Sequence, residues 1–256
     1  MFIAVAGKGG TGKTTFVALT VKHLLKAGER PILAVDADAN ANLSQALGIK
    51  APHSIADIMR TVAENRESIP AGMTKDRYVA YRIHESLAEG KDVDLLEMGG
   101  PEGPGCYCYV NNLLRGYIKE LVSNYRHVLM DNEAGLEHLS RRTTQNVDVL
   151  FVLSDATVKG VRSAGRVREL AESLKLGIKR QYLVINRAGP DEIKVLEPEI
   201  KNSGLEYVGR VPSDPMVAEY DLYLRPLLAL PEGSTAVEAV GDILKKVEIL
   251  QEGWDK

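Results

Sequence analysis

The sequence predicts an α/β fold in which a mainly parallel sheet is flanked by helices on both faces. Short apolar runs of strand length alternate with longer stretches of helical periodicity along the 256 residues. A glycine-rich segment, Gly7–Thr14, separates the first apolar run from the first helical stretch, where α/β sheets carry ligand-binding loops. No repeat, low-complexity tract or long linker interrupts this alternation. We therefore expect one domain over residues 1–256.

The individual elements follow from the same two periodicities. A further apolar run at Tyr78–His84 is expected to form an additional short strand. The expected strands are Phe2–Ala6, Pro31–Val35, Val93–Glu97, His127–Met130, Val149–Leu153, Gln181–Ile185 and Tyr207–Val211. The expected helices are Lys13–Ala27, Ile55–Asn65, Val110–Ser123, Ser163–Leu174, Glu192–Asn202 and Thr235–Leu250.

The composition and charge of the chain disfavour nucleic-acid-binding and membrane-spanning classes of protein. Hydrophobic residues make up 45% of the chain, which is enough for a sizeable core, and the net charge of −3 does not favour nucleic acid as a partner. No segment approaches the ~18 consecutive apolar residues of a transmembrane helix, so no membrane partner is expected. The N-terminus enters a strand without a basic-then-apolar leader. These features predict a cytoplasmic protein whose two cysteines are reduced thiols.

The glycine-rich segment reads G-x-x-x-x-G-K-T, which is the phosphate-binding P-loop. Its backbone N–H groups would face phosphate oxygens, Lys13 would reach the β- and γ-phosphates, and the Thr14 hydroxyl would ligate Mg²⁺. The same residues satisfy G-x-G-x-x-G, but Lys13 and Thr14 favour a nucleoside triphosphate over a dinucleotide. The expected nucleotide-binding residues of this loop are Gly9, Gly10, Thr11, Gly12, Lys13, Thr14 and Thr15.

Acidic residues end two of the apolar runs. Asp36 and Asp38 follow one run and Asp131 follows another, so all three are expected at the carboxyl edge of the sheet. There Asp36 and Asp38 would order Mg²⁺-bound waters or the attacking water. The alternative is that Asp36 and Asp38 only cap a turn.

A second lysine, Lys8, makes the loop G-K-G-G-T-G-K-T. This resembles the deviant Walker A motif of the MinD/ParA/nitrogenase-iron-protein group, and the chain is identified as a single-domain P-loop NTPase of that group. The resemblance implies a homodimer in which Lys8 contacts the partner's phosphates. It also implies that Asp38 orients the attacking water, which makes Lys8, Lys13 and Asp38 the expected catalytic residues. Some relatives carry acids where this chain has Asn40 and Asn42, which leaves the hydrolysis rate open.

The resemblance extends to other parts of the nucleotide site. Asp131 resembles the Walker B acid, which implies that it holds a Mg²⁺-bound water by hydrogen bonding. Gly135 resembles the switch II glycine, whose N–H near the γ-phosphate responds to hydrolysis. Asn186 is expected to hydrogen-bond the base, Arg187 to stack on it, and the loop at Pro212 to read adenine through its backbone. No aspartate follows at the guanine-selecting position, so ATP is favoured over GTP.

Both cysteines lie in Cys106-Tyr107-Cys108. An i, i+2 pair closes too small a ring for a structural disulfide but can place two thiolates on one soft metal ion. A tetrahedral thiolate site takes four ligands, which two chains related by a two-fold axis would supply. A redox pair is the alternative, although C-x-x-C is commoner there.

Together, the Lys8 P-loop, the Asp131–Leu139 segment and the C-Y-C motif resemble the CooC-type nickel-insertion ATPases. These mature the cluster of carbon monoxide dehydrogenase or, in a sister group, of acetyl-CoA synthase. The resemblance implies ATP-dependent dimerisation, Ni(II) or Zn(II) held by Cys106 and Cys108 of both subunits, and metal release coupled to hydrolysis. His138 could be a further ligand, but a packed or solvated histidine is the more common case.

Other functions remain open. A MinD/ParA-like positioning switch could bind a membrane through the apolar stripe of the last helix, although core packing is favoured there. An electron-donating ATPase like the nitrogenase iron protein is disfavoured because that family uses cysteines well separated in sequence. A small-molecule kinase or synthetase would need a second substrate site, for which no motif is recognisable. The stripe consists of Val237, Val240, Ile243, Leu244, Val247 and Leu250.

Overall fold

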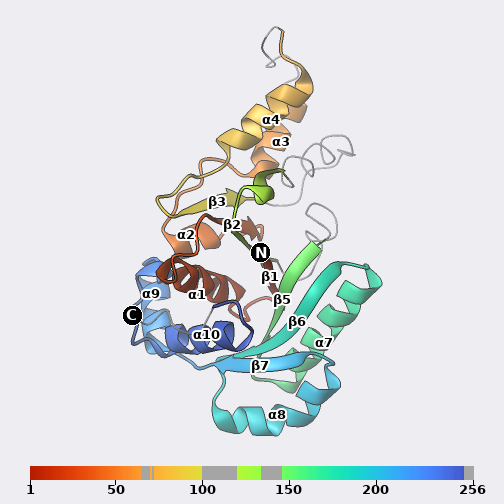
Figure 1. The fold of residues 1–256 in the computed structure, drawn as a ribbon, viewed down its shortest axis with the longest axis vertical. Coiled ribbons are helices and arrows are strands. Elements are labelled where there is room, and N and C mark those ends of the chain that lie inside the picture. The colour runs from red at the N-terminus through yellow and green to blue at the C-terminus, as the bar shows by residue number, and fades with distance from the viewer. Residues whose placement is uncertain (65–69, 71, 100–119, 134–145, 251–256) are drawn as a thin grey trace.

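Seven parallel strands form one sheet in the order β3-β2-β4-β1-β5-β6-β7 (Figure 1). The computed structural model describes residues 1–64, 70, 72–99, 120–133 and 146–250. All the strand pairings within this sheet are parallel, as the sequence predicts. The strands are β1 Phe2–Gly7, β2 Ile32–Ala37, β3 Val93–Glu97, β4 His127–Asn132, β5 Asn146–Asp155, β6 Gly177–Asn186 and β7 Glu206–Val211.

Helices cover both faces of the sheet (Figure 1). On one face lie α1, α2, η2 and α10, and on the other lie α3, α4, α7 and α8. Every parallel connection in an open sheet needs such a crossover, and this explains the alternation in the sequence. The helices are α1 Lys13–Lys26, α2 Leu43–Leu47, α3 Ile55–Glu64, α4 Lys75–Glu85, α7 Val158–Ser173, α8 Pro190–Asn202, α9 Pro215–Leu222, η2 Leu227–Ala229 and α10 Thr235–Lys246.

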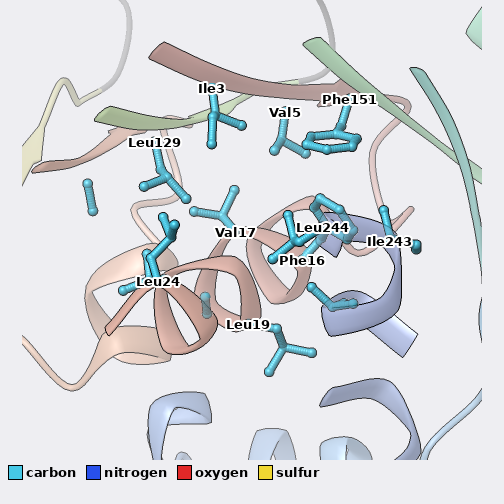
Figure 2. Packing of buried hydrophobic residues seen from close by; sticks show 14 of the residues in the cluster. Ile3, Val5, Phe16, Val17, Leu19, Leu24, Leu129, Phe151, Ile243 and Leu244 are labelled. Atoms are coloured by element: carbon cyan, nitrogen blue, oxygen red, sulfur yellow. The ribbon is translucent and has the colours of Figure 1, made fainter. Parts of the chain in front are cut away.

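Helix α1 lies against the centre of the sheet, where it is held by the core drawn in Figure 2. Phe16 of α1 meets Phe151 of β5 edge to face, with ring centroids 5.0 Å apart. Leu244 of α10 is fully buried in the same cluster. Because α1 begins directly after the glycine-rich loop, this packing fixes the loop against the carboxyl edge of the sheet.

The apolar stripe of the last helix belongs to this core. All of its members are buried, which confirms the expectation of core packing. Helix α10 ends at Lys246, earlier than expected, but the chain stays buried as far as Leu250. In the part of the chain that the structure describes, no helix is long and apolar enough to cross a membrane.

The strand expected at Tyr78–His84 is wrong, because these residues lie inside α4. The Thr74 hydroxyl accepts a hydrogen bond from the Arg77 amide and caps the helix. Val79 and Ile83, four residues apart, are both buried, so the apolar residues follow a helical period rather than the period of a strand. The pair α3 and α4 stands above β3 in Figure 1.

Several boundaries differ from the expected ones. Helix α7 begins at Val158 rather than Ser163, because the Thr157 hydroxyl accepts from the Gly160 amide and caps it earlier. Helices α2 and α9 were not expected and are short. Of the helix expected at Val110–Ser123, residues 120–123 are helical and the rest lies outside the described residues.

Candidate functional site

The glycine-rich loop crosses the carboxyl edge of the sheet in a conformation that only glycine fits. Gly7 has φ 148° and Gly12 has φ 87°. A Cβ atom on Gly7 would lie 2.3 Å from the Leu153 carbonyl oxygen, and one on Gly12 would lie 2.1 Å from Asn186 Nδ2. The loop is therefore packed so closely against the ends of β5 and β6 that a side chain fits at neither position.

Within the loop, three donors converge on the carbonyl oxygen of Lys8. The Thr11 amide lies 3.3 Å from it, the Thr11 hydroxyl 2.8 Å and the Lys13 ammonium 3.4 Å. Lys13 is only 6% exposed, so its charge is held in a dry environment where it would interact strongly with phosphate. The Lys8 side chain is exposed, as a residue that acts across a dimer would have to be.

The Thr14 hydroxyl and the Asp131 carboxylate are hydrogen-bonded to each other. Thr14 Oγ1 donates to Asp131 Oδ2 at 2.5 Å, while Asp131 Oδ1 is buried without a hydrogen-bond partner. Burial raises the pKa of Asp131 to about 7, Asp36 adds to the rise, and Lys13 and the Thr14 hydrogen bond oppose it. A hydroxyl beside a buried carboxylate with one unpaired oxygen is a donor set that fits Mg²⁺ and its bound waters.

Asp36 and Asp38 have different environments. Asp36 is 1% exposed, and its two oxygens accept from the Asp38 amide at 3.0 Å and the Leu43 amide at 2.8 Å. Burial raises the pKa of Asp36 to about 6. Asp38 is only partly buried, and its Oδ1 accepts two hydrogen bonds from Asn40. Asp36 therefore holds the turn together, and Asp38 is the acid accessible to a ligand.

Of the residues expected around the base, Asn186 contacts the P-loop directly. Asn186 Nδ2 donates to the Thr11 carbonyl at 2.8 Å, and Asn186 Oδ1 accepts from the Arg187 amide at 3.0 Å. Arg187 is exposed and has φ 54°. Pro212 directly follows β7, which is tied to this corner by the Ala188 amide bonding the Val211 carbonyl at 3.2 Å. Asn186 therefore links the P-loop to the end of β6, and its contact with the base stays a prediction.

Two residues at this edge were missed by the sequence reasoning. Asn132 is 1% exposed, donates to the Val5 carbonyl at 3.0 Å and leaves its own Oδ1 unpaired. The Asn40 side-chain amide donates to Asp38, although from the sequence Asn40 was interpreted only as a position where some relatives carry an acid. Asp38 and Asn40 have the spacing of an Asx turn, in which an Asp side chain accepts from the backbone amide two residues on, and this spacing was the available signal.

Four of the residues singled out in the sequence belong to segments that the structure does not describe. Gly135, Cys106, Cys108 and His138 lie outside the described residues. Among the residues that the structure describes, no three or more His, Cys, Asp or Glu side chains are grouped so that they could hold a metal ion.

Comparison with known proteins places the chain among nucleotide-binding domains. The family model described as the CobQ/CobB/MinD/ParA nucleotide binding domain matches residues 2–227. An uncharacterized ATP-binding protein of Methanocaldococcus jannaschii is 45% identical over 249 residues, which cover 96% of this chain and 98% of that protein. The carbon monoxide dehydrogenase accessory protein CooC of Rhodospirillum rubrum is 30% identical over 233 residues, covering 86% of this chain and 87% of that protein.

The fold is also that of a solved structure. The MinD cell division protein of Aquifex aeolicus superposes over 100% of both chains with a TM-score of 0.70 and 21% sequence identity. At that identity, the likeness concerns the arrangement of strands and helices.

Proposed function

The chain belongs to the CobQ/CobB/MinD/ParA nucleotide-binding family, and we propose that it acts within this family as an ATP-hydrolysing metallochaperone. It would close into a homodimer on ATP, bind Ni(II) or Zn(II) between two subunits, and deliver nickel to the metallocluster of carbon monoxide dehydrogenase or acetyl-CoA synthase. The observation that carries the proposal is the motif Cys106-Tyr107-Cys108 in a chain 30% identical to a carbon monoxide dehydrogenase accessory protein.

The P-loop edge supports the ATPase half of this proposal. Lys13 would exchange the Lys8 carbonyl for the β- and γ-phosphates and stabilise the charge that develops as the bond to the leaving ADP breaks. Asp38 would orient the water whose oxygen forms the new bond to phosphorus. Thr14 and Asp131 would hold Mg²⁺ and its waters, and the bound ion would neutralise phosphate charge.

Dimerisation would link hydrolysis to the metal. The exposed Lys8 would reach the phosphates bound by the partner, so ATP would stabilise the closed dimer more than the open state. Closure would bring Cys106 and Cys108 of both subunits together as four thiolates. Loss of the γ-phosphate would weaken the closed state and release the ion to the client enzyme.

The proposal is tested by titrating Ni²⁺ into anaerobic, reduced protein with and without a non-hydrolysable ATP analogue. Thiolate-to-metal absorption reports binding and light scattering reports mass. We expect one ion per dimer and no binding in the C106S/C108S double variant, which should still bind nucleotide. Nickel affinity that is unchanged in the double-serine variant contradicts the metallochaperone mechanism.

An ATP-dependent positioning switch is the second candidate, favoured by a family match that includes MinD and ParA. Such a switch would bind a membrane or DNA in its ATP state. The apolar stripe of α10 is buried in the core, so a membrane-binding surface would have to lie elsewhere. Co-sedimentation of the ATP-bound protein with anionic liposomes or with duplex DNA separates this candidate from the first.

A further inference from the structure

We propose that Asn40 is a positioning residue for Asp38, fixing one oxygen of its carboxylate so that the other faces the attacking water. This inference rests on the proposed ATPase function. Both the backbone N–H and the side-chain Nδ2 of Asn40 donate to Asp38 Oδ1, each at 2.9 Å. No hydrogen bond to Asp38 Oδ2 is found within the described part of the chain, so this oxygen is the one available to a ligand.

The surrounding turn fixes the backbone that carries Asp38. Its amide donates to the buried Asp36 carboxylate at 3.0 Å, and its carbonyl accepts from the Ala41 amide at 3.1 Å. The same Asp36 carboxylate holds the Leu43 amide, where α2 begins. With backbone and one carboxylate oxygen both held, Asp38 retains little rotational freedom, although it is only partly buried. A catalytic group that is already held in its reactive orientation loses less conformational entropy on reaching the transition state.

The chemistry of Asn40 suits this task. A neutral amide donates to one carboxylate oxygen without placing a positive charge beside it, and the other oxygen is left to accept a hydrogen bond from water. A carboxylate in place of Asn40 would set two like charges about one hydrogen-bond length apart and push Asp38 out of position. Some relatives are expected to carry acids at the positions of Asn40 and Asn42, and in this chain the Asn40 amide donates to Asp38 instead.

Asn42 provides a matched control in the same turn. It is also an asparagine, it lies two residues further along, and it is exposed. As the N-cap residue of α2 it makes no side-chain capping hydrogen bond. A substitution at Asn42 therefore changes the same residue type and the same local charge without touching Asp38.

The experiment compares steady-state ATP hydrolysis of the full chain and its variants, with nucleotide affinity measured separately by a fluorescent ADP analogue and folding by thermal denaturation. We expect Asn40→Ala to lower kcat about tenfold with KM and nucleotide affinity within about twofold. Asn40→Asp should lower kcat further, and Asn40→Gln, which keeps a donor, should recover at least about threefold over alanine. Asn42→Ala and Asn42→Asp should stay within about twofold of the parent.

Equal kcat values for Asn40→Ala and Asn42→Ala would overturn the inference, as would a loss of kcat that only follows a fall in Tm. Asp38→Ala separates the positioning role of Asn40 from the proposed ATPase function. If it abolishes hydrolysis while Asn40→Ala does not change kcat, the positioning role fails and the proposed ATPase function stands. If Asp38→Ala hydrolyses ATP normally, the role proposed for Asp38 fails and the inference about Asn40 fails with it.

Discussion

The Thr14 hydroxyl donates to the Asp131 carboxylate at 2.5 Å and so joins the first turn of α1 to the end of β4, across 117 residues of sequence. Both strand end and helix start are held by the core, so this pair is set before any ligand arrives. The arrangement leaves Asp131 Oδ1 buried and unpaired. An unpaired buried carboxylate oxygen costs folding free energy, and its consequences can be measured.

The first prediction concerns Asp131→Asn in the nucleotide-free protein. Burial raises the pKa of Asp131 to about 7, above its ordinary value of 3.8. The folded state therefore binds this proton more tightly, and stability that is present at low pH is lost as pH rises from about 4 to about 7. Asparagine cannot ionise, so the variant should exceed the parent in Tm by several degrees at pH 8, with a smaller difference at pH 5.

Asp148→Asn provides a control of opposite sign. Burial alone would raise the pKa of Asp148, but hydrogen bonds from Lys179 and the Phe2 amide lower it overall. Stability from this group is present at neutral pH and lost as pH falls through the depressed pKa. This variant should therefore have a lower Tm than the parent at pH 8. An Asp131→Asn variant that is also less stable at pH 8 would show that the Asp131 carboxylate is not destabilising.

The second prediction concerns Thr14→Ala. Removing the hydroxyl takes away the expected Mg²⁺ ligand and a partner of Asp131, so Mg²⁺ should no longer strengthen nucleotide binding by more than about twofold. Affinity for ADP in the presence of EDTA should be nearly unchanged, because the loop backbone and Lys13 remain. Thr14→Ser, which keeps the hydroxyl, should retain most of the Mg²⁺ effect. Calorimetry with and without Mg²⁺ measures both quantities.

Local chemistry explains why much of this architecture could be predicted. The order of strands and helices follows from the periodicity of the apolar residues. The P-loop follows from a motif whose glycines, such as Gly7 and Gly12, are required by the backbone conformation. The assignment of Tyr78–His84 to a strand failed because a short apolar run fits both periods, and the cap at Thr74 that decides between them is weak in sequence.

The roles of individual polar residues needed the fold. The positions of Asp36 and Asp38 after one apolar run do not distinguish them, and only the family resemblance assigned the attacking water to Asp38. The turn between β2 and α2 shows that the Asp36 carboxylate accepts from two backbone amides, the amides of Asp38 and Leu43. Asn186 was expected to contact the base, but its amide also holds the P-loop carbonyl of Thr11, a contact across 175 residues. Such long-range pairings depend on the sheet order and cannot be read from local spacing.

The third prediction concerns the turn that carries Asp38. Ala41 has φ 50°, a left-handed conformation that side chains disfavour. Ala41→Gly should remove this strain and raise the free energy of unfolding by about 0.5 kcal/mol, after the greater flexibility of glycine in the unfolded chain is counted. Ala39→Gly, in the same turn without a positive φ, should lower it by about the same amount. Chemical denaturation measures both, and equal effects of the two substitutions would contradict the argument.

The last prediction separates the role of Asn186, the last residue of β6, from that of Arg187, which follows it. Asn186→Ala leaves the Thr11 carbonyl without its donor at a buried position, so it should cost about 1–3 kcal/mol of stability and distort the P-loop. It should therefore weaken the binding of ATP and of inorganic tripolyphosphate alike.

Arg187→Ala removes an exposed side chain, so Tm should stay within about 1 °C, and only ATP, which has a base to stack on, should bind more weakly. Competition of each ligand with a fluorescent nucleotide measures the four affinities. If Arg187→Ala weakens tripolyphosphate binding as strongly as ATP binding, Arg187 acts on the phosphates rather than on the base.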